Sequence, residues 1–184
     1  MFIQTEQTPN PATLKFLPGR DVMGSGTADF ATAEAAKRSP LAEHLFTVEG
    51  VTGVFLGCDF ITVTKAGDKD WHLLKPAILG AIMEHFTSGR PIVAAPAAAS
   101  EGAAGEEDSE VVAQIKDLIE TRVRPAVAQD GGDIILQGFE DGIVFLHLQG
   151  SCSGCPSSTA TLKAGIENML KHYVPEVVEV RAVM

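Results

Sequence analysis

The sequence predicts an α+β protein of two small domains, each a small sheet packed against helices, joined by a flexible linker. Runs of β-branched residues and helical repeats of apolar residues occur on both sides of residues 89–109, which carry neither pattern. Of the 184 residues, 45% are hydrophobic and 6% are aromatic. The chain is therefore long enough for two small cores, and those cores should be mainly aliphatic.

Residues 89–109 form the predicted linker between a domain at 1–88 and a domain at 110–184. They include seven alanines, three glycines and two prolines, and they end in an acidic run. Such a composition has little to bury and is typical of a mobile connection. An alanine-rich surface helix is the alternative, but the prolines and glycines disfavour it.

The first domain is predicted to contain three strands and at least two helices. A short strand closed by a turn is expected at 14–19. Two β-branched runs at 50–57 and 60–67 flank a Gly-Cys-Asp turn and predict a hairpin. A helix is expected to begin at Pro40, with Ser39 as its N-cap.

The second helix of the first domain is predicted from an apolar stripe at steps of four residues. The stripe consists of Leu74, Ile78, Ile82 and Phe86. Asp70 suits the N-cap position, and Trp71 is expected to anchor the start of this helix. Pro76 is compatible with the helix only near its first turn.

The second domain is predicted to run helix, strand, strand, helix, strand, with the helices on one face of a small sheet. Asp108 or Ser109 should cap its first helix, and Pro125 should end or kink it. Runs at 133–139 and 142–150 flank a Glu-Asp-Gly turn and predict a hairpin. The second helix carries the stripe Leu162, Ile166, Met169, Leu170 and Tyr173, and a strand closes the domain.

Composition excludes several classes of function. A net charge of −10 argues against broad nucleic-acid binding, and three cysteines do not make a secreted disulfide framework. No apolar run approaches the roughly 20 residues needed to cross a membrane, and we see no signal peptide. We expect a soluble protein of a reducing compartment, the bacterial cytoplasm, with a matured mitochondrial matrix protein as the alternative.

Two of the three cysteines, Cys152 and Cys155, form a Cys-x-x-Cys motif within "GSCSGCPSST". Gly150 lets the chain turn after a strand, and Pro156 favours the first position of a helix. Both sulfurs are thus expected near a helix N-terminus, where backbone N–H groups and the helix dipole stabilise anions. The neighbouring serines and glycine are small, so a bulky inorganic group can approach the backbone.

The spacing alone leaves three kinds of functional site open, while the surrounding Ser, Gly and Pro residues disfavour an ordinary buried pair of cysteines. A thioredoxin-like dithiol also uses Cys-x-x-Cys at a helix start, but near the first strand of a βαβ unit. A zinc site needs a second cysteine pair or a histidine pair, and this chain offers neither. A cluster shared by two copies of the chain would obtain four thiolates by symmetry, two from each copy.

Three runs around the motif are more specific than its spacing. They are Asp-Gly-Gly-Asp at 130–133, Gly-x-Cys-x-Gly-Cys-Pro-Ser-Ser at 150–158 and Thr-Leu-Lys at 161–163. With them, residues 124–170 resemble the NifU C-terminal domain of the Nfu-type iron–sulfur carriers. Residues 4–19 and 70–86 resemble the Nfu N-terminal domain, so the resemblance covers nearly the whole chain outside the linker.

The resemblance implies a carrier that binds a [4Fe-4S] cluster between two protomers and hands it to apo-proteins. The implied ligands are Cys152 and Cys155 of each protomer, and a [2Fe-2S] form is also compatible. The implied partners are a second copy, client apo-proteins and an upstream assembly scaffold. The N-terminal domain is implied to be a docking module, and no nucleophile–base pair or general acid predicts an enzyme.

Several other residues are predicted to be structural. Cys58 is expected to be a buried or turn residue, with a transient sulfur or iron donor role as the alternative. The Asp-Gly-Gly-Asp run is expected to be a tight turn, His147 a residue on a sheet face, and Lys163 either solvated or a counter-charge to a cluster. The remaining histidines are expected to be solvated; they are His44, His72, His85 and His172.

Overall fold

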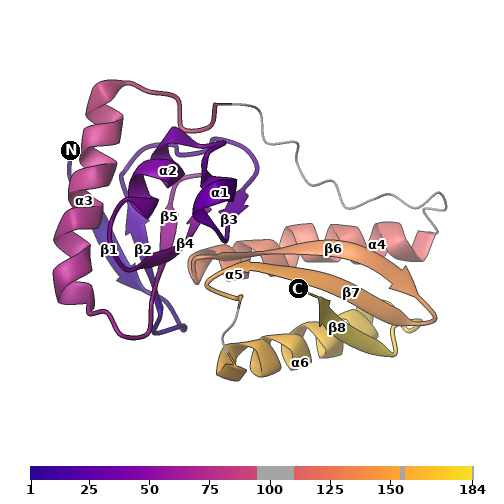
Figure 1. The fold of residues 1–184 in the computed structure, drawn as a ribbon. Helices are drawn as coiled ribbons and strands as arrows, with labels where there is room; N and C mark the ends of the chain where they lie inside the picture. Colours follow the sequence, from indigo (N-terminus) through magenta and orange to yellow (C-terminus); the bar gives the residue numbers. More distant parts are fainter. Residues whose placement is uncertain (95–109, 154–155, 184) are drawn as a thin grey trace. The chain divides into compact units, whose positions relative to one another are not determined.

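The structure is a computed structural model that describes residues 1–94, 110–153 and 156–183, with the backbone alone at 156–159. The chain divides into two compact units, Met1–Ala99 and Ser100–Met184, and each is described by itself. Both units combine a sheet with helices (Figure 1), which confirms the α+β class with two domains. The linker boundaries at 89 and 109 stay a prediction.

The first unit is built on an antiparallel sheet in the strand order β1-β2-β5-β4-β3 (Figure 1). Its strands are β1 (Gln4–Gln7), β2 (Thr13–Leu17), β3 (Ala28–Phe30), β4 (Val51–Leu56) and β5 (Ile61–Lys65). The predicted hairpin is confirmed, because β4 and β5 pair antiparallel with Leu56 opposite Ile61. The edge strand β1 is polar throughout and β3 has only three residues, so neither shows a strand pattern in the sequence.

Three helices, α1 (Ala33–Ala36), α2 (Pro40–Phe46) and α3 (Trp71–Ser88), accompany this sheet. The predicted N-caps are confirmed. Ser39 Oγ accepts a hydrogen bond from the Ala42 N–H at 3.1 Å, and Asp70 Oδ1 accepts one from the His72 N–H at 2.9 Å. Each cap satisfies one of the N–H groups that a helix start leaves without a partner.

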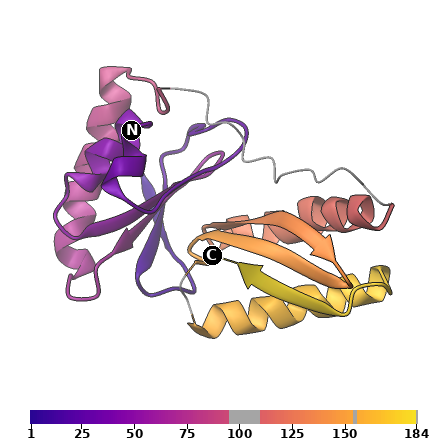
Figure 2. The same cartoon turned by 45° about the vertical axis from the view of Figure 1, so that its right-hand side comes forward.

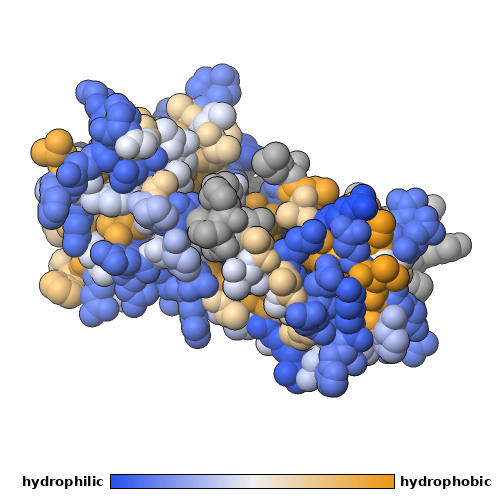
Figure 3. All heavy atoms as spheres, turned by 90° about the horizontal axis from the view of Figure 1, so that it is seen from below, coloured by the Kyte–Doolittle hydropathy of each residue, from blue (hydrophilic) through white to orange (hydrophobic). Residues whose placement is uncertain are grey.

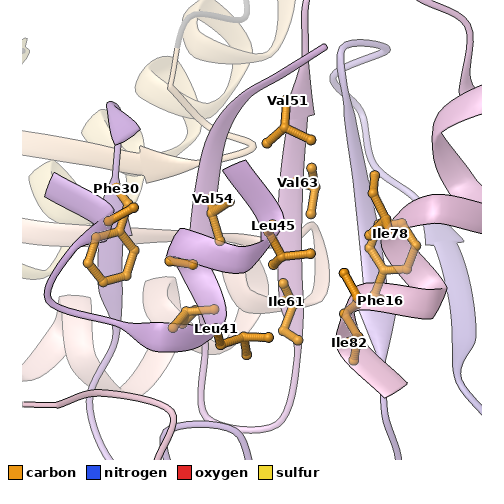
Figure 4. Close-up of a cluster of buried hydrophobic side chains, with 14 of the residues drawn as sticks. Phe16, Phe30, Leu41, Leu45, Val51, Val54, Ile61, Val63, Ile78 and Ile82 are labelled. Carbon is orange, nitrogen blue, oxygen red and sulfur yellow. The ribbon is translucent and has the colours of Figure 1, made fainter. Parts of the chain in front are cut away.

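The core of the first unit lies between one face of the sheet and the helices α2 and α3. Figure 4 shows Leu41 and Leu45 of α2 and Ile78 and Ile82 of α3 directed toward the apolar side chains of the strands. The strand side chains in this core include Phe16, Phe30, Val51, Val54, Ile61 and Val63. The predicted stripe of α3 is therefore its buried face.

His85 extends this buried face, which makes the prediction of a solvated side chain wrong. Its side chain is 3% exposed. It follows Ile82 by three residues and Ile78 by seven, and this spacing places all three on one side of a helix. Trp71 does anchor the start of α3, since its Nε1 donates to the Pro11 carbonyl at 3.2 Å.

The residues just after α3 pack against the first unit. The Ala94 N–H donates to the Arg38 carbonyl at 2.9 Å, and Ser39 Oγ donates to the Ile92 carbonyl. Ile92 and Val93 also contact the apolar core. The beginning of the predicted linker, as far as Ala94, is therefore part of the packing of this unit.

The second unit has a three-stranded sheet in the order β6-β7-β8. Its elements are α4 (Glu110–Leu118), a π-helical turn (Ile119–Val123), α5 (Arg124–Gln129), β6 (Gly132–Glu140), β7 (Ile143–Gly150), α6 (Pro156–Tyr173) and β8 (Glu179–Val183). The predicted order and the β6–β7 hairpin are confirmed. The predicted cap residues Asp108 and Ser109 lie outside the described residues.

The helices of this unit share one core with the sheet. Figures 1 and 2 show α4 and α6 running alongside the strands. Side chains from both helices join Ile134, Val144, Leu146 and Val180 in one buried cluster. The parallel pairing of β7 with β8 requires a crossover connection, and α6 supplies it.

Pro125 does not end its helix; the helical path continues to Gln129. The distortion lies before the proline, where the Arg124 N–H donates to the Ile119 carbonyl five residues back. Proline removes an N–H group and crowds the carbonyl four residues earlier. A widened π-helical turn accommodates both effects while the helix continues.

Hydrophobic and hydrophilic residues are mixed on the surface that Figure 3 shows. The large exposed hydrophobic residues of the described chain include Leu73 and Met83 on α3 and Val178 before β8. Among the described residues, no helix has both the length and the apolar character needed to cross a membrane.

Candidate cluster-binding site

The cysteine motif lies where β7 ends and α6 begins, as predicted. Gly150 ends β7 with a φ of 64°, and the Ser153 N–H donates to the Gly150 carbonyl at 3.1 Å, closing a turn. Cys152 lies in this turn and is 6% exposed. α6, an 18-residue helix, begins at Pro156, three residues after Ser153 in the sequence, and a helix start is the positive end of the helix dipole. Cys155 lies outside the described residues.

The Asp-Gly-Gly-Asp run packs beside this turn. Gly131 has a φ of 79°, a backbone conformation that favours glycine, and so the run forms a tight turn as predicted. The Ser151 N–H donates to the Gly131 carbonyl at 3.2 Å, and Ser151 Oγ donates to the Asp130 carbonyl. Two hydrogen bonds thus join the turn before β6 to the residue next to Cys152.

Gly132 lies directly against the Cys152 sulfur. It is the first residue of β6 and pairs with Gly150, the last residue of β7. A Cβ atom placed on Gly132 would lie 2.6 Å from Cys152 Sγ, 2.9 Å from the Gln149 carbonyl oxygen and 3.2 Å from the Cys152 nitrogen. Carbon atoms pack at about 3.5–4.0 Å. The space that a side chain would need is therefore occupied by the cysteine turn.

An ion pair ties the same turn to the helix that precedes it. Arg124 donates to Asp133 through Nε at 2.9 Å and through a terminal nitrogen at 2.8 Å. The Asp133 side chain is 5% exposed, and its Oδ1 also accepts from the Ile134 N–H at 2.8 Å. A bidentate arginine–carboxylate pair fixes both distance and orientation. It therefore fixes the start of β6 relative to α5.

Charged side chains further along α6 bind to β8 rather than to the cysteine turn. Lys163 Nζ lies 3.9 Å from Glu179 Oε1. Glu167 accepts from Lys171 Nζ at 2.7 Å and from the Val180 N–H at 3.2 Å. The hydrogen bond from Lys171 is the main reason that the pKa of Glu167 lies below its usual value. β8 is an edge strand of the sheet. Glu167 accepts from one of its backbone N–H groups, which would otherwise be available for pairing with another strand.

The third cysteine belongs to the first unit. Cys58 lies in the turn between β4 and β5, is exposed, and has its Sγ 3.6 Å from the Gly26 carbonyl oxygen. It is thus a turn residue, as predicted. His147 lies on β7 opposite Ile135 and Val183 and is partly buried, as expected of a sheet residue. Within the described ranges, no group of three or more His, Cys, Asp or Glu side chains is arranged to hold a metal ion.

The sequence did not show the contact between the Asp-Gly-Gly-Asp turn and Cys152. The two segments lie about twenty residues apart, and two adjacent glycines before a strand are compatible with any tight turn. The one usable signal was the second glycine. Only Gly131 takes the positive φ that the turn requires. The backbone angle of Gly132 is compatible with other residues, so its lack of a side chain must serve a contact.

Comparison with known proteins shows that both units of the chain match known families. Residues 3–89 match the family described as "Scaffold protein Nfu/NifU N terminal", and residues 115–181 match the family described as "NifU-like domain". A solution structure of a NifU-like protein from Saccharomyces cerevisiae shares 27% identity, covering 50% of this chain and 84% of its own, at a TM-score of 0.46.

Two curated relatives align over nearly the whole chain. The "NFU1 iron-sulfur cluster scaffold homolog, mitochondrial" of Homo sapiens is 59% identical over 185 residues, which cover 100% of this chain and 72% of the relative. The "NifU-like protein 4, mitochondrial" of Arabidopsis thaliana is 56% identical over 181 residues, which cover 96% of this chain and 64% of the relative. With both of its domains matched, the chain belongs to the Nfu/NifU family.

Proposed function

We propose that this chain is a scaffold and carrier for an iron–sulfur cluster, which it holds as cargo and transfers to apo-proteins. The observation that carries the proposal is the place of Cys152 in a turn that leads into α6, in a chain of this family. A helix start favours thiolates and an anionic cargo. The relatives named as cluster scaffolds support the same role.

The proposed ligands are Cys152 and Cys155 from each of two copies of the chain. An iron–sulfur cluster requires four thiolates, and one Cys-x-x-Cys motif provides two. A two-fold axis through the site would supply the other two from a second copy. We propose a [4Fe-4S] cluster for this site, and a [2Fe-2S] cluster needs the same number of thiolates.

Transfer would proceed by ligand exchange. In each step a client thiolate forms a bond to iron as one bond from iron to Cys152 or Cys155 breaks, so no electron changes hands. A site divided between two chains opens when the two chains separate. The first unit would act as a docking module that keeps the client close and raises its effective concentration. In this scheme the chain is not an enzyme.

The clients would be apo forms of iron–sulfur proteins, and an upstream scaffold would supply the cluster. The curated relatives reported above are mitochondrial by name. Their names favour a mitochondrial location, as in the alternative above, over the bacterial cytoplasm. Neither nucleic acid nor a membrane is part of the proposed function.

Anaerobic loading with iron and sulfide tests the proposal. We expect about four iron and about four sulfide per two chains, with conversion of monomer to dimer on loading. Cys152→Ser and Cys155→Ser should each abolish loading, whereas Cys58→Ser, a matched change in the other unit, should leave it intact. Cluster retention by both motif variants would rule out these ligands. A colourless monomer with one zinc, or reduction of a model disulfide without metal, would refute the carrier role.

A further inference from the structure

We propose that the Asp130–Asp133 turn is a positioning element for the Cys152 thiol, and that Gly132 is its central residue. The inference rests on the proposed function, because the position of the thiol matters for a site shared with a second chain. The turn would fix where the Cys152 sulfur points before any cargo arrives. Neither Gly132 nor Asp133 would contact the cargo.

Gly132 defines the position of the sulfur by leaving space for it. A Cβ atom here would lie 2.6 Å from Cys152 Sγ and 2.9 Å from the Gln149 carbonyl oxygen. Gln149 is held in β7 by its pairing with Asp133. The sulfur is the end of a short side chain and must move by about an ångström to restore a normal contact. Rotation about the Cα–Cβ bond or a shift of the turn would then redirect the thiol.

Hydrogen bonds support the turn from two sides. Ser151 donates to the Asp130 and Gly131 carbonyls through its side chain and backbone. Arg124 fixes Asp133 from the other side through two hydrogen bonds of 2.9 and 2.8 Å. The cysteine turn is therefore supported from α5 and β6 as well as by its own helix.

Positioning matters more in a shared site than in a site within one chain. Ligands must be held within about 0.5 Å of their working geometry. In a two-fold site each displacement of the sulfur occurs twice, once in each copy. Loss of a residue that orients a metal ligand typically weakens metal retention about 10- to 100-fold. We expect that range for loss of the Gly132 space.

The chain offers a matched control for Gly132→Ala. Gly138 lies in the same strand, and a Cβ atom there would meet nothing within 4 Å. Neither glycine has a positive φ, so alanine is compatible with the backbone at both positions. A difference between Gly132→Ala and Gly138→Ala therefore reports the contact with the cysteine turn and not the general effect of removing a glycine.

The first readout is made on the full chain without cargo. The alkylation rate of Cys152 at fixed pH, resolved from Cys155 by tandem mass spectrometry, should change at least about fivefold in Gly132→Ala, because a thiol that is 6% exposed must move. It should not change in Gly138→Ala. The second readout is the rate at which a chelator removes iron from the loaded dimer, which should rise about 10- to 100-fold in Gly132→Ala alone.

A third readout covers the case in which Gly132→Ala destabilises the unit. Cys152→Ala removes the sulfur that the new methyl group meets, so Gly132→Ala should lower the denaturant midpoint less in a Cys152→Ala background than in the unaltered chain. Arg124→Lys keeps the charge but loses the bidentate fork. Because Arg124 holds the turn beside Cys152 through Asp133, Arg124→Lys should also change the alkylation rate of Cys152.

These outcomes separate the inference from the proposed function. If the unaltered chain takes up no iron and sulfide, the carrier role fails, while alkylation and the denaturant midpoints still test the positioning role. Equal alkylation rates in Gly132→Ala and Gly138→Ala would overturn the inference. An equal loss of denaturant midpoint on Gly132→Ala with and without Cys152→Ala would overturn it as well, because the conflict would then not involve the sulfur.

Discussion

His85 provides the clearest test of the energetics of the first unit. Its side chain is 3% exposed, and within the described residues its Nε2 is buried without a hydrogen-bond partner. Burial is the main cause that lowers its pKa, and the charge of His44 acts in the same direction. A hydrogen bond with the Arg90 backbone opposes the shift. The structure thus keeps a polar ring in an apolar site at a cost.

The perturbation is His85→Leu. A buried polar atom without a partner costs about 1–3 kcal/mol, and leucine removes that cost. Losing the bond to the Arg90 backbone and changing the shape of the side chain offset about 1 kcal/mol of the gain. Near neutral pH we therefore expect the free energy of unfolding of the first unit to rise by about 1 kcal/mol.

The pH dependence follows from the direction of the pKa shift. Since the folded-state pKa lies below 6.5, the value for an ordinary histidine, the unfolded state binds the proton more readily. The free energy of unfolding of the unaltered chain should therefore fall as the pH drops below 6.5, and level off below the folded-state pKa. His85→Leu should lack this component. His44, which lies 3.7 Å from Glu84, remains in both proteins.

The only tryptophan, Trp71, lies at the start of α3 and reports on this unit alone. Denaturant unfolding followed by Trp71 fluorescence, from about pH 5.5 to about pH 8, gives the free energy of unfolding near neutral pH and its dependence on pH. His72→Leu is the matched control, because His72 is an exposed histidine of the same helix. Parallel pH profiles for the unaltered chain and His85→Leu would refute the reasoning. So would a loss of more than about 1.5 kcal/mol near neutral pH, since Nε2 would then have a stabilising partner.

Three further changes test other parts of the fold. Ser39→Ala removes the cap of α2 and the bond to the Ile92 carbonyl, and Trp71 fluorescence should show a loss of about 1–2 kcal/mol; an unchanged midpoint would contradict the cap. Leu170→Ala empties a fully buried site of the second unit and should cost about 3 kcal/mol, measured by hydrogen exchange in β7. Gly142→Ala, at a φ of 79° and with a Cβ 2.7 Å from Val178, should cost about 2 kcal/mol, whereas Gly138→Ala should cost nearly nothing.

Local signals predicted the elements that depend on neighbouring residues. Ser39 and Asp70 cap their helices as expected, and the Glu-Asp-Gly turn connects β6 to β7 with positive φ values at Asp141 and Gly142. These features depend on hydrogen bonds and backbone angles within a few residues, so the types of the neighbouring residues are enough to predict them. The same holds for the start of α6 at Pro156.

Features that depend on distant contacts were not predicted. The parallel pairing of β7 and β8 is decided by where α6 leads the chain, and no local pattern shows it. The sequence predicts that Pro125 ends or kinks its helix; the helix does not end there, and a π-helical turn at Ile119–Val123 accommodates the distortion. Residue type predicts a solvated His85, but its spacing from Ile78 and Ile82 places it on the buried face of α3.

The contact of Gly132 with Cys152 combines a local feature that the sequence predicts with a distant contact that it does not. The cysteine motif was found from its spacing, while the residues that hold it in place lie in another segment and do no chemistry themselves. For the proposed carrier this arrangement would have a physical advantage. Rigid support would fix the sulfur within each chain, and division of the site between two chains would keep the cargo removable. Affinity could then be set by how two well-ordered halves meet, and release would require only that they part.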